Sequence, residues 1–419
     1  MSMEEKQNFQ TSQDFSESIL KPINEEEISE IIKDCYKKNI PLEILGLGTK
    51  RSIGRNFQFE KTLDLSNYSG IIDYSPEELY IKVKSGTPIK QIREELEKNN
   101  QYLAFEPVDF GFLFSGKNDE GTIGGVMSCN FAGPRRFKAG SIRDHVLGFK
   151  GINGRGEKIK SGGTVVKNVT GYDLSKILSG SFGTLAVLSE ITIKVLPKPE
   201  SNKTLVIKNP HLKKGLEYLN LSLSSSSDPS GAVFYPENFR SFFIFNDLTF
   251  SGPITAIRME GATSSIDHRI KKLIKELEVI SDETVILSKE QSDIFWEDTR
   301  NLKVFSKLKE NLIRIVVPPS TTFELLNKLK NFDVKYFVDW GGSLVWLQLD
   351  KINSKILKDI KMIVKAASGY STIIKIDENL KASIDIFTID PVKHDVSEKI
   401  KKSFDPKRIL NPGKMYIGI

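Results

Sequence analysis

The sequence has few of the residues that build disulfide frameworks and metal centres. Its 419 residues include two cysteines, Cys35 and Cys129, and four histidines. Two cysteines cannot form a disulfide framework, so a reducing compartment is expected. The dispersed histidines do not suggest a metal centre. We therefore predict no metal site, and two cysteines are also too few to hold an iron–sulfur cluster, because clusters are held by several cysteine thiolates.

Long apolar runs and a secretory leader are also missing. No stretch approaches the roughly 20 apolar residues that span a bilayer, and the first ten residues are polar and acidic where a leader would be basic and then apolar. The 60 basic and 54 acidic side chains leave a net charge of +6, without the basic stripe of a nucleic-acid binder. We expect a cytoplasmic protein that has no transmembrane segment, does not bind nucleic acid, and reaches the inner membrane only through partners.

Several catalytic signatures are absent, whereas glycine is concentrated in one region. The phosphate-loop lysine motif, the His-Glu-x-x-His motif, the calcium loop and the Gly-x-Ser-x-Gly elbow do not occur, which disfavours hydrolytic and metal chemistry.

Of the 30 glycines, 14 fall between Gly121 and Gly183. Glycine lets the backbone approach a ligand closely and lets N–H groups converge on an anion. This region is therefore expected to line a ligand site.

The length predicts two or three domains. The glycine-rich half ends at Pro197-Lys198-Pro199, and the β-α-β-β order beyond it predicts an antiparallel sheet covered by helices on one face. We expect an α+β protein with a first domain over residues 18–199, split into two lobes near residue 104, a cap over 200–400, and a tail over 401–419 that returns to the first domain. The expected helices are Asn24–Lys38, Ile89–Lys98, Ser265–Leu277 and Thr322–Lys330. The expected strands are Ile40–Leu47, Lys61–Leu65, Leu79–Val83, Leu147–Ile152, Thr164–Val166, Leu185–Val195, Ile254–Glu260, Leu312–Val317, Val334–Val338 and Leu344–Leu349.

Three segments suit a ligand that carries a pyrophosphate and a flat ring. The first, Gly46–Gly54, follows a strand, but it returns to a strand at Lys61 instead of opening a helix, so it is not a Rossmann loop. Alone it is equally compatible with a tight hairpin-like turn. Paired with Gly121–Gly125, it is better explained as one of two N–H cradles, one for each half of a pyrophosphate. The third segment, Val166–Lys176, mixes polar and aromatic residues among glycines, which suits a heteroaromatic ligand; a helix start capped by Asp173 is compatible with the same residues.

On specific stretches the sequence resembles FAD-linked oxidases of the vanillyl-alcohol oxidase (PCMH) type, and within them the FAD-binding E subunits of bacterial glycolate oxidase. These stretches are Phe105–Pro107, Gly121–Gly125, Ala132–Arg136, Gly140–Gly148 and Val166–Leu174, with weaker matches at Arg258–Gly261, Asp339–Gly342 and Asn411–Lys414. The resemblance implies a two-lobed FAD-binding domain followed by an α+β cap with an antiparallel sheet. Relatives that tether FAD covalently use a histidine in the first loop, which has none here, so we expect non-covalent FAD.

The resemblance also implies which residues hold the cofactor. The pyrophosphate would be held by Gly46, Gly48, Thr49, Lys50, Thr122, Gly124 and Gly125. The flavin channel would be lined or supported by Ser141, Asp144, Lys167, Asn168, Tyr172 and Asp173, and the nucleotide end by Gly183, Thr184 and Ile191. Pro107, Gly121, Ser128 and Asn411 complete the implied cofactor set.

The implied reaction is oxidation of glycolate, a small 2-hydroxy acid, to glyoxylate. The implied partners are a homologous FAD-containing catalytic D subunit and an iron–sulfur F subunit that receives the electrons. The D subunit's histidine- and glutamate-rich motif is absent here, so oxidation mainly on the D subunit is one hypothesis. A self-sufficient FAD-dependent hydroxy-acid or alditol dehydrogenase, and a structural subunit whose flavin pocket no longer works, are the alternatives.

No catalytic residue is assigned from the sequence. Arg135 and Arg136 are candidates for binding a substrate carboxylate, because an arginine fork fits a carboxylate through two hydrogen bonds. Solvent exposure or an interface salt bridge is the alternative role for this pair. Arg258, Arg300 and Arg314 in the cap are weaker candidates of the same kind.

Overall fold

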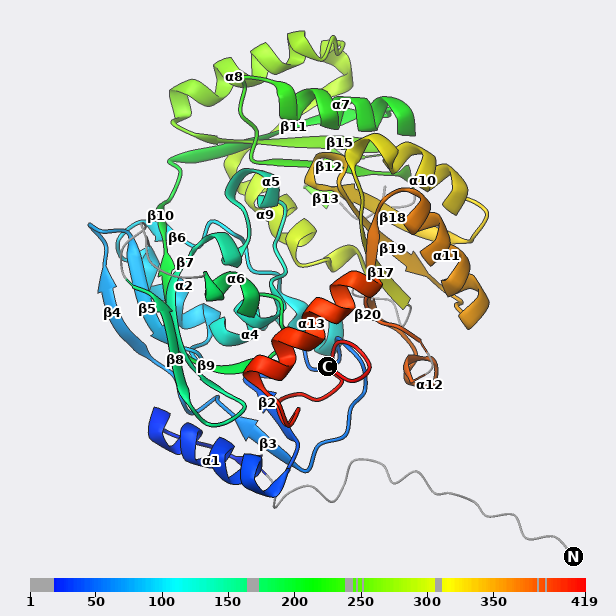
Figure 1. The fold of residues 1–419 in the computed structure, drawn as a ribbon. Coiled ribbons are helices and arrows are strands. Elements are labelled where there is room, and N and C mark those ends of the chain that lie inside the picture. The colour runs from blue at the N-terminus through cyan, green and yellow to red at the C-terminus, as the bar shows by residue number, and fades with distance from the viewer. Residues whose placement is uncertain are drawn as a thin grey trace, which may run out of the picture.

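The N-terminal residues form a small parallel sheet. In the computed structural model (Figure 1), which describes residues 19–163, 173–237, 244–245, 248–250, 252–305, 311–382, 384–388 and 390–419, the strand order of this sheet is β1-β3-β2. Its strands are β1 (Ile19–Leu20), β2 (Leu42–Leu45) and β3 (Lys61–Asp64). Helix α1 (Glu25–Lys38) begins where the Asn24 side chain accepts a hydrogen bond from the Glu27 amide, and it carries acids in its first turn and lysines in its last. The helix predicted over Asn24–Lys38 is confirmed.

A second, antiparallel sheet follows, with the strand order β4-β5-β9-β7-β8. Its strands are β4 (Ile71–Ser75), β5 (Tyr80–Lys84), β7 (Val146–Asn153), β8 (Lys158–Gly162) and β9 (Ala186–Lys194). The short elements around it are α2 (Ile89–Glu97), β6 (Gln101–Tyr102), α3 (Phe110–Ser115), α4 (Ile123–Cys129), α5 (Arg136–Ala139), η1 (Ile142–Asp144), α6 (Leu174–Leu178) and β10 (Leu196–Pro197). The central strand β9 is buried almost throughout, which fits its apolar sequence. The strand predicted over Thr164–Val166 lies outside the described residues.

The sheets divide earlier than the split expected near residue 104. Strands β4 and β5 precede that position, yet β5 pairs with β9 and so belongs to the second sheet. The boundary between the sheets therefore lies between β3 and β4. This pairing joins segments that are far apart in the chain, and periodicity within a segment carries no information about such a partner.

The cap contains one eight-stranded antiparallel sheet made of two similar units. The first unit runs β11 (Ser201–Lys208), α7 (Leu212–Ser224), β12 (Gly231–Tyr235), β15 (Ile254–Gly261), α8 (Thr263–Glu276) and β16 (Thr284–Leu287). The second runs β17 (Asn311–Val316), α10 (Thr322–Leu329), β18 (Val334–Asp339), β19 (Leu344–Leu349), α11 (Ser354–Ala366) and β20 (Tyr370–Lys375). The sheet order β16-β11-β15-β12-β18-β19-β17-β20 shows the same arrangement in both units, joined where β12 meets β18. The predicted antiparallel sheet is confirmed.

Helices cover both faces of this sheet to different extents. Figure 1 shows α7, α8, α10 and α11 on the outer face; of these, α8 and α10 match the helices predicted over Ser265–Leu277 and Thr322–Lys330. Helix α9 (Lys289–Arg300) lies on the other face, toward the first domain, where Phe295 and Trp296 share a core with Val206 of β11. The expectation that the helices lie on one face is therefore wrong for α9. Strands β13 (Ile244–Phe245) and β14 (Leu248–Thr249) form a separate pair.

The last part of the chain connects the cap back to the small parallel sheet. After α12 (Glu378–Lys381), helix α13 (Pro391–Phe404) crosses in front of both parts (Figure 1). Leu410 then forms a parallel bridge with Leu42 of β2. One continuous core includes Val108, Phe110 and Phe131 together with the cap strands, so the two parts pack directly on each other. No helix in the described ranges is long and apolar enough to cross a bilayer.

Candidate functional site

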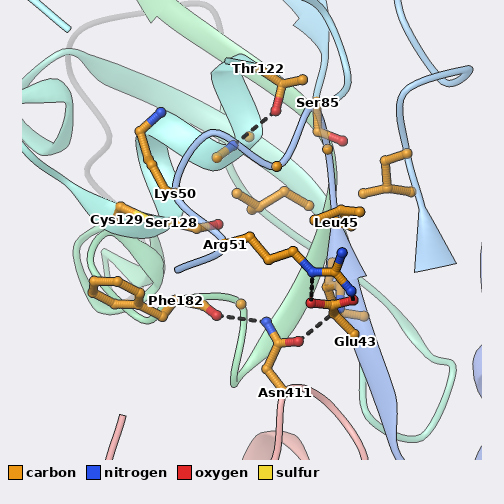
Figure 2. A pocket seen from close by; sticks show the side chains of 18 of the residues that line it. Glu43, Leu45, Lys50, Arg51, Ser85, Thr122, Ser128, Cys129, Phe182 and Asn411 are labelled. Carbon is orange, nitrogen blue, oxygen red and sulfur yellow. Dashed lines mark hydrogen bonds and ion pairs between the residues drawn. The ribbon is translucent and has the colours of Figure 1, made fainter. Parts of the chain in front are cut away.

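A cavity lies where β2, α4, β9 and the tail meet (Figure 2). It encloses about 820 Å³ of space free of protein atoms, including its open mouth. It is lined by Glu43, Ile44, Leu45, Gly46, Leu47, Gly48, Thr49, Lys50, Arg51, Phe57, Leu65, Ser85, Thr122, Gly124, Gly125, Ser128, Cys129, Phe182, Gly183, Ala186, Leu188, Asn411 and Lys414. Mostly apolar walls with a few convergent polar groups are typical of cofactor sites.

The loop after β2 presents free backbone amides to this cavity. None of the N–H groups of Leu47, Gly48, Thr49 and Lys50 donates a hydrogen bond to a described residue. Gly48 has a φ of +74°, a conformation that glycine adopts without strain. Successive unpaired amides in such a loop form a concave site that binds anions. The first loop thus has the donors that a pyrophosphate needs.

The two glycine loops pack directly against each other. A Cβ atom at Gly46 would lie 2.5 Å from Oγ1 of Thr122, and one at Gly121 would lie 2.5 Å from Oγ1 of Thr49. Any side chain at either position would therefore push the loops apart. The pairing of the two loops that the sequence predicted is present in the structure.

The second loop differs from the predicted cradle in how its amides are used. The Gly124 amide donates to the carbonyl of Ser85 at 2.8 Å, and the Gly125 amide donates to Oγ1 of Thr122 at 3.2 Å. These amides cap α4 and hold it in place, so they are not free to bind a ligand. The second loop therefore mainly allows a ligand to approach the backbone closely. Beside it, Oγ of Ser85 is buried and has no hydrogen-bond partner among the described residues. This hydroxyl is available to a ligand at the cavity wall.

Three basic side chains surround the first loop, and Glu43 is the only acidic residue among those that line the cavity. Nζ of Lys50 donates to the Glu120 carbonyl at 2.9 Å and is directed away from the loop amides (Figure 2). Arg51 binds Glu43 through two hydrogen bonds of 2.8 and 2.7 Å. Nζ of Lys414 donates to the Arg51 carbonyl at 2.6 Å, and burial lowers the Lys414 pKa to about 8. The net positive charge favours a phosphate-containing ligand.

The tail completes the wall through Asn411. Its Oδ1 accepts the Ile44 amide at 2.7 Å, and its Nδ2 donates to the Phe182 carbonyl at 2.8 Å (Figure 2). A Cβ atom at Gly183 would lie 2.8 Å from that Nδ2 atom. Asn411 therefore joins β2 to the turn before β9 across the cavity wall.

The structure brings part of the predicted cofactor set together. The predicted residues that line the cavity are Gly46, Gly48, Thr49, Lys50, Thr122, Gly124, Gly125, Ser128, Gly183 and Asn411. Those outside its lining are Pro107, Gly121, Ser141, Asp144, Asp173, Thr184 and Ile191. Lys167, Asn168 and Tyr172 lie outside the described residues, so these three remain predictions.

Several of the residues outside the lining have local structural contacts instead. Ser141 and Asp144 form a capping box on η1, and Ile191 is fully buried in the core of the second sheet. The Thr184 carbonyl accepts a hydrogen bond from Lys401. The sequence reasoning assigned no ligand role to Arg51, Ser85, Phe182 and Lys414, which line the cavity. Two of them carried a signal, since Arg51 lies within the Gly46–Gly54 loop and Lys414 lies within the matched Asn411–Lys414 stretch.

Arg135 forms a buried ion-pair network between the first domain and the cap. Its guanidinium donates to Glu260 at 2.8 and 2.6 Å and lies 3.1 Å from Glu106. Arg258 binds Glu106 at 2.9 Å, and the two arginines help to lower the Glu260 pKa to about 2. Arg135 thus fits the interface salt bridge, the alternative role, because two carboxylates already bind its guanidinium. Arg258 is likewise held by Glu106 and Ser230.

Arg136 and Arg300 also have partners. Arg136 is partly exposed, binds Asp144 at 2.9 Å, and lies 5.9 Å from the Trp340 ring centre. Arg300 donates to Oδ1 of Asn301 at 2.9 Å and lies 3.9 Å from Glu120. Neither presents a free guanidinium fork.

Arg314, on β17, is the exception among the candidate arginines. It is buried, it forms no ion pair with a described residue, and its guanidinium lies 4.9 Å from the ring centre of Trp340 and 5.7 Å from that of Phe131. Burial lowers its pKa, while the neighbouring Tyr370 hydroxyl acts in the opposite direction. A buried guanidinium without a carboxylate partner is costly unless an anion binds it.

Cys129 is half-buried and His145 is buried, both in structural surroundings. Burial raises the pKa of the Cys129 thiol to about 11, so it is protonated at neutral pH. His145 is buried, and its Nε2 lies 2.8 Å from the Ala139 carbonyl. Among the described residues no group of His, Cys, Asp and Glu is arranged to hold a metal ion.

The chain matches the model of the FAD binding domain over residues 16–162. It is 31% identical to glycolate oxidase subunit GlcE of Escherichia coli strain K12 over 407 residues, which cover 96% of this chain and 98% of that protein. It is 23% identical to glycolate oxidase subunit GlcD of Bacillus subtilis strain 168, over 96% of this chain and 90% of that protein. A solved alkyldihydroxyacetonephosphate synthase superposes with a TM-score of 0.69 at 16% identity, over 94% of this chain and 75% of that one.

Proposed function

Because the chain belongs to the family of FAD-linked oxidases that includes the glycolate oxidase subunits, we propose that it is the FAD-binding subunit of a glycolate (2-hydroxy acid) oxidase complex. FAD is its cofactor, and the predicted α+β fold of the vanillyl-alcohol oxidase (PCMH) type is confirmed by the family match and the superposition. The observation that carries the proposal is the loop of unpaired amides at the base of a positively charged cavity.

The residues present fit the cofactor. The amides of Leu47–Lys50 would hold the pyrophosphate, with Lys414 adding charge from the tail. The unpartnered hydroxyl of Ser85 and the apolar wall formed by Leu45, Leu188 and Phe182 suit an amphipathic nucleotide. When bound, FAD would accept the hydride from the α-carbon of the hydroxy acid. The first loop contains no histidine that could form a covalent link, which supports non-covalent binding.

We further propose that Arg314 binds the carboxylate of the hydroxy acid. Its guanidinium is buried without a carboxylate partner in the described part of the chain, and Trp340 and Phe131 hold it from two sides. Phe131 in turn lies 6.1 Å from Phe182, a residue that lines the cavity, as measured between ring centres. Arg314 is therefore close to the cavity, and in the described part of the chain its guanidinium has the Tyr370 hydroxyl as a neighbour but no carboxylate, unlike that of Arg135.

The proposed complex includes a homologous D subunit and an iron–sulfur F subunit, which would carry the electrons onward. The relatives named as glycolate oxidase subunits D and E support a complex of several chains. A self-sufficient dehydrogenase, for which the 25% identical D-lactate dehydrogenase of Anaerostipes hadrus is a model, is the second candidate. We expect a cytoplasmic protein whose contact with the membrane, if any, is made by its partners.

The test is an absorbance spectrum of the purified chain, followed by addition of glycolate. We expect flavin bands that glycolate bleaches when the partners are present, and complete release of the flavin from acid-denatured protein. Bleaching of the isolated chain at the full rate would favour the self-sufficient dehydrogenase. A protein that stays colourless with added FAD would contradict the proposal, and flavin retained on the denatured chain would contradict non-covalent binding.

Affinity for FAD is expected to fall from about pH 8 upward. The folded protein lowers the pKa of Lys414 to about 8, so its positive charge near the loop amides is lost above that pH. Loss of a charge-assisted contact weakens binding by about tenfold. Folding without FAD shows the opposite trend, because a depressed lysine pKa costs stability below pH 8 and this cost declines as the pH rises. Titrations of FAD at pH 7 and 9.5 measure the change, and Lys414→Met should flatten it.

A further inference from the structure

Helix α13 is anchored to the first domain by its C-terminal half, where Ile400 and Phe404 pack against the core of the second sheet, whereas its N-terminal half leaves apolar side chains exposed. It has 14 residues, and Lys401, near its C-terminal end, is its only buried residue. In its N-terminal half Val392 is 73% exposed and Val396 is 51% exposed, and the neighbouring tail exposes Ile417 at 70%. Isolated helices of this length are marginally stable in water, and most helices in proteins are stabilised by burying an apolar face. This face of α13 is therefore suited to be covered by another molecule.

The exposed face borders a second hollow. It is lined by Thr388, Val392, Lys393, Val396, Ser397 and Tyr416, so it lies between α13 and the tail. Val392, Val396 and Tyr416 give this hollow a partly apolar wall beside exposed apolar side chains, which suits insertion of a partner's apolar side chain, the arrangement found at the centre of protein interfaces. We refer to Val392, Val396, Tyr416 and Ile417 as the α13 surface.

Aromatic rings connect the α13 surface to the proposed cofactor cavity. Phe182 lines that cavity, and its ring centre lies 5.0 Å from that of Phe387. The Phe387 ring lies 5.9 Å from that of Tyr416, which lines the second hollow. Both contacts are edge-to-face packing. Phe182, Phe387 and Tyr416, which we call the ring wall, thus run from the lining of one hollow to the lining of the other.

We propose that the α13 surface is the docking surface of an iron–sulfur protein that accepts electrons from this subunit. The inference rests on the proposed function. Oxidation of the hydroxy acid to the oxo acid removes an electron pair and two protons; the electrons reduce ferric iron in the partner's cluster to ferrous iron, and the protons go to solvent. The cluster cannot belong to this chain, because Cys35 is buried in the core of the first sheet and Cys129 is its only other cysteine.

The position of the surface fits this occupant better than a second copy of the chain. Electron transfer weakens steeply with distance, so an acceptor must dock where the protein between cofactor and surface is thin, and the ring wall is such a place. The surface is also small, and electron-transfer contacts are typically below about 1,200 Å² of buried area. A homodimer usually needs a larger apolar patch.

The first test compares iron content in purified complexes. The tagged chain is isolated from its own cells with its bound partners, and iron and acid-labile sulfide are measured per FAD for the wild type and for Val392→Glu/Val396→Glu. Two carboxylates placed in an apolar contact must be desolvated without a partner, so we expect iron per FAD to fall by about tenfold or more. FAD per chain and the circular dichroism spectrum should stay unchanged.

A matched control carries the same change elsewhere. Ile280 is 65% exposed, in the loop after α8 and far from α13 in Figure 1, so Ile280→Glu should keep the wild-type iron content. A second measurement uses no destabilising change: a photoreactive residue at position 396 should crosslink to the iron-containing protein, and one at position 280 should not.

Two results would overturn the proposal. Wild-type chain that co-purifies without iron would refute the partner, and iron retained in the double variant together with no crosslink from position 396 would refute the surface. Failure of the proposed function has a different signature, since glycolate would then leave the wild-type flavin unreduced whether or not iron co-purifies. The two hypotheses are therefore tested separately.

Discussion

Replacing Lys401 by methionine is expected to lower the free energy of unfolding by about 3–5 kcal/mol, the cost of leaving a buried charge without its partner. Lys401 is fully buried, and its Nζ donates to Oδ2 of Asp405 at 2.8 Å, to the Thr184 carbonyl at 2.6 Å and to the Leu410 carbonyl at 2.9 Å. All three ammonium protons are therefore used. These bonds attach α13 to the turn before β9 and to the tail, so the loss should also weaken FAD binding.

The measurement is urea denaturation followed by circular dichroism and flavin fluorescence. Lys402→Met is the matched control, because Lys402 is exposed on the same helix and should change stability by less than about 0.5 kcal/mol. The double variant Lys401→Met/Asp405→Asn removes both charges and should recover part of the loss. A single variant as stable as the wild type would show that this ion pair does not hold the tail.

Replacing Arg314 by methionine is expected to raise the KM for glycolate by about 100-fold, the cost of losing a charge-assisted contact worth about 3 kcal/mol. Methionine keeps the apolar contact with Trp340 and Phe131, so the fold and FAD content should be preserved. Flavin reduction in a stopped-flow instrument gives the substrate dependence directly. The maximal rate of reduction should change less than KM, since the group acts mainly in binding.

Two further variants distinguish this role from a structural one. Arg314→Lys retains the charge but not the fork, so it should recover only part of the affinity. Arg136→Met tests the partly exposed arginine that also lies near the Trp340 ring. Arg136 binds Asp144, so this variant should have little effect on KM. A large effect of Arg136→Met together with none of Arg314→Met would reverse the assignment.

Features that depend on residues close together in the chain, such as helix caps and glycine loops, were predicted from the sequence. The Asn24 cap with its acidic first turn predicted α1, and the glycines at positions 46 and 121 predicted two loops that leave no room for a side chain. These features depend on residues close together in the chain or on backbone conformations that glycine favours. The loop at Gly46–Gly54 was correctly distinguished from a Rossmann loop, because β3 follows it instead of a helix.

Long-range partners could not be predicted in the same way. Arg135 finds Glu260 only because the cap folds back onto the first domain, and Lys401 finds Thr184 through the tail. Neither partner has a sequence signature, since any buried acid or carbonyl could serve. The same limit explains why the split between the lobes was expected near residue 104, after β5, and why Arg314, which has no carboxylate partner in the described residues, could not be separated from Arg135.

The path of the tail has a consequence for how the protein is made. Asn411 and Lys414 belong to the wall of the proposed cofactor cavity, which is otherwise built from residues before position 189. During synthesis the first domain emerges from the ribosome long before these residues, so the nascent chain presents a cavity with one side missing. FAD should therefore be captured tightly only after translation has passed residue 414, and a cell short of FAD would accumulate full-length protein whose tail is not yet seated.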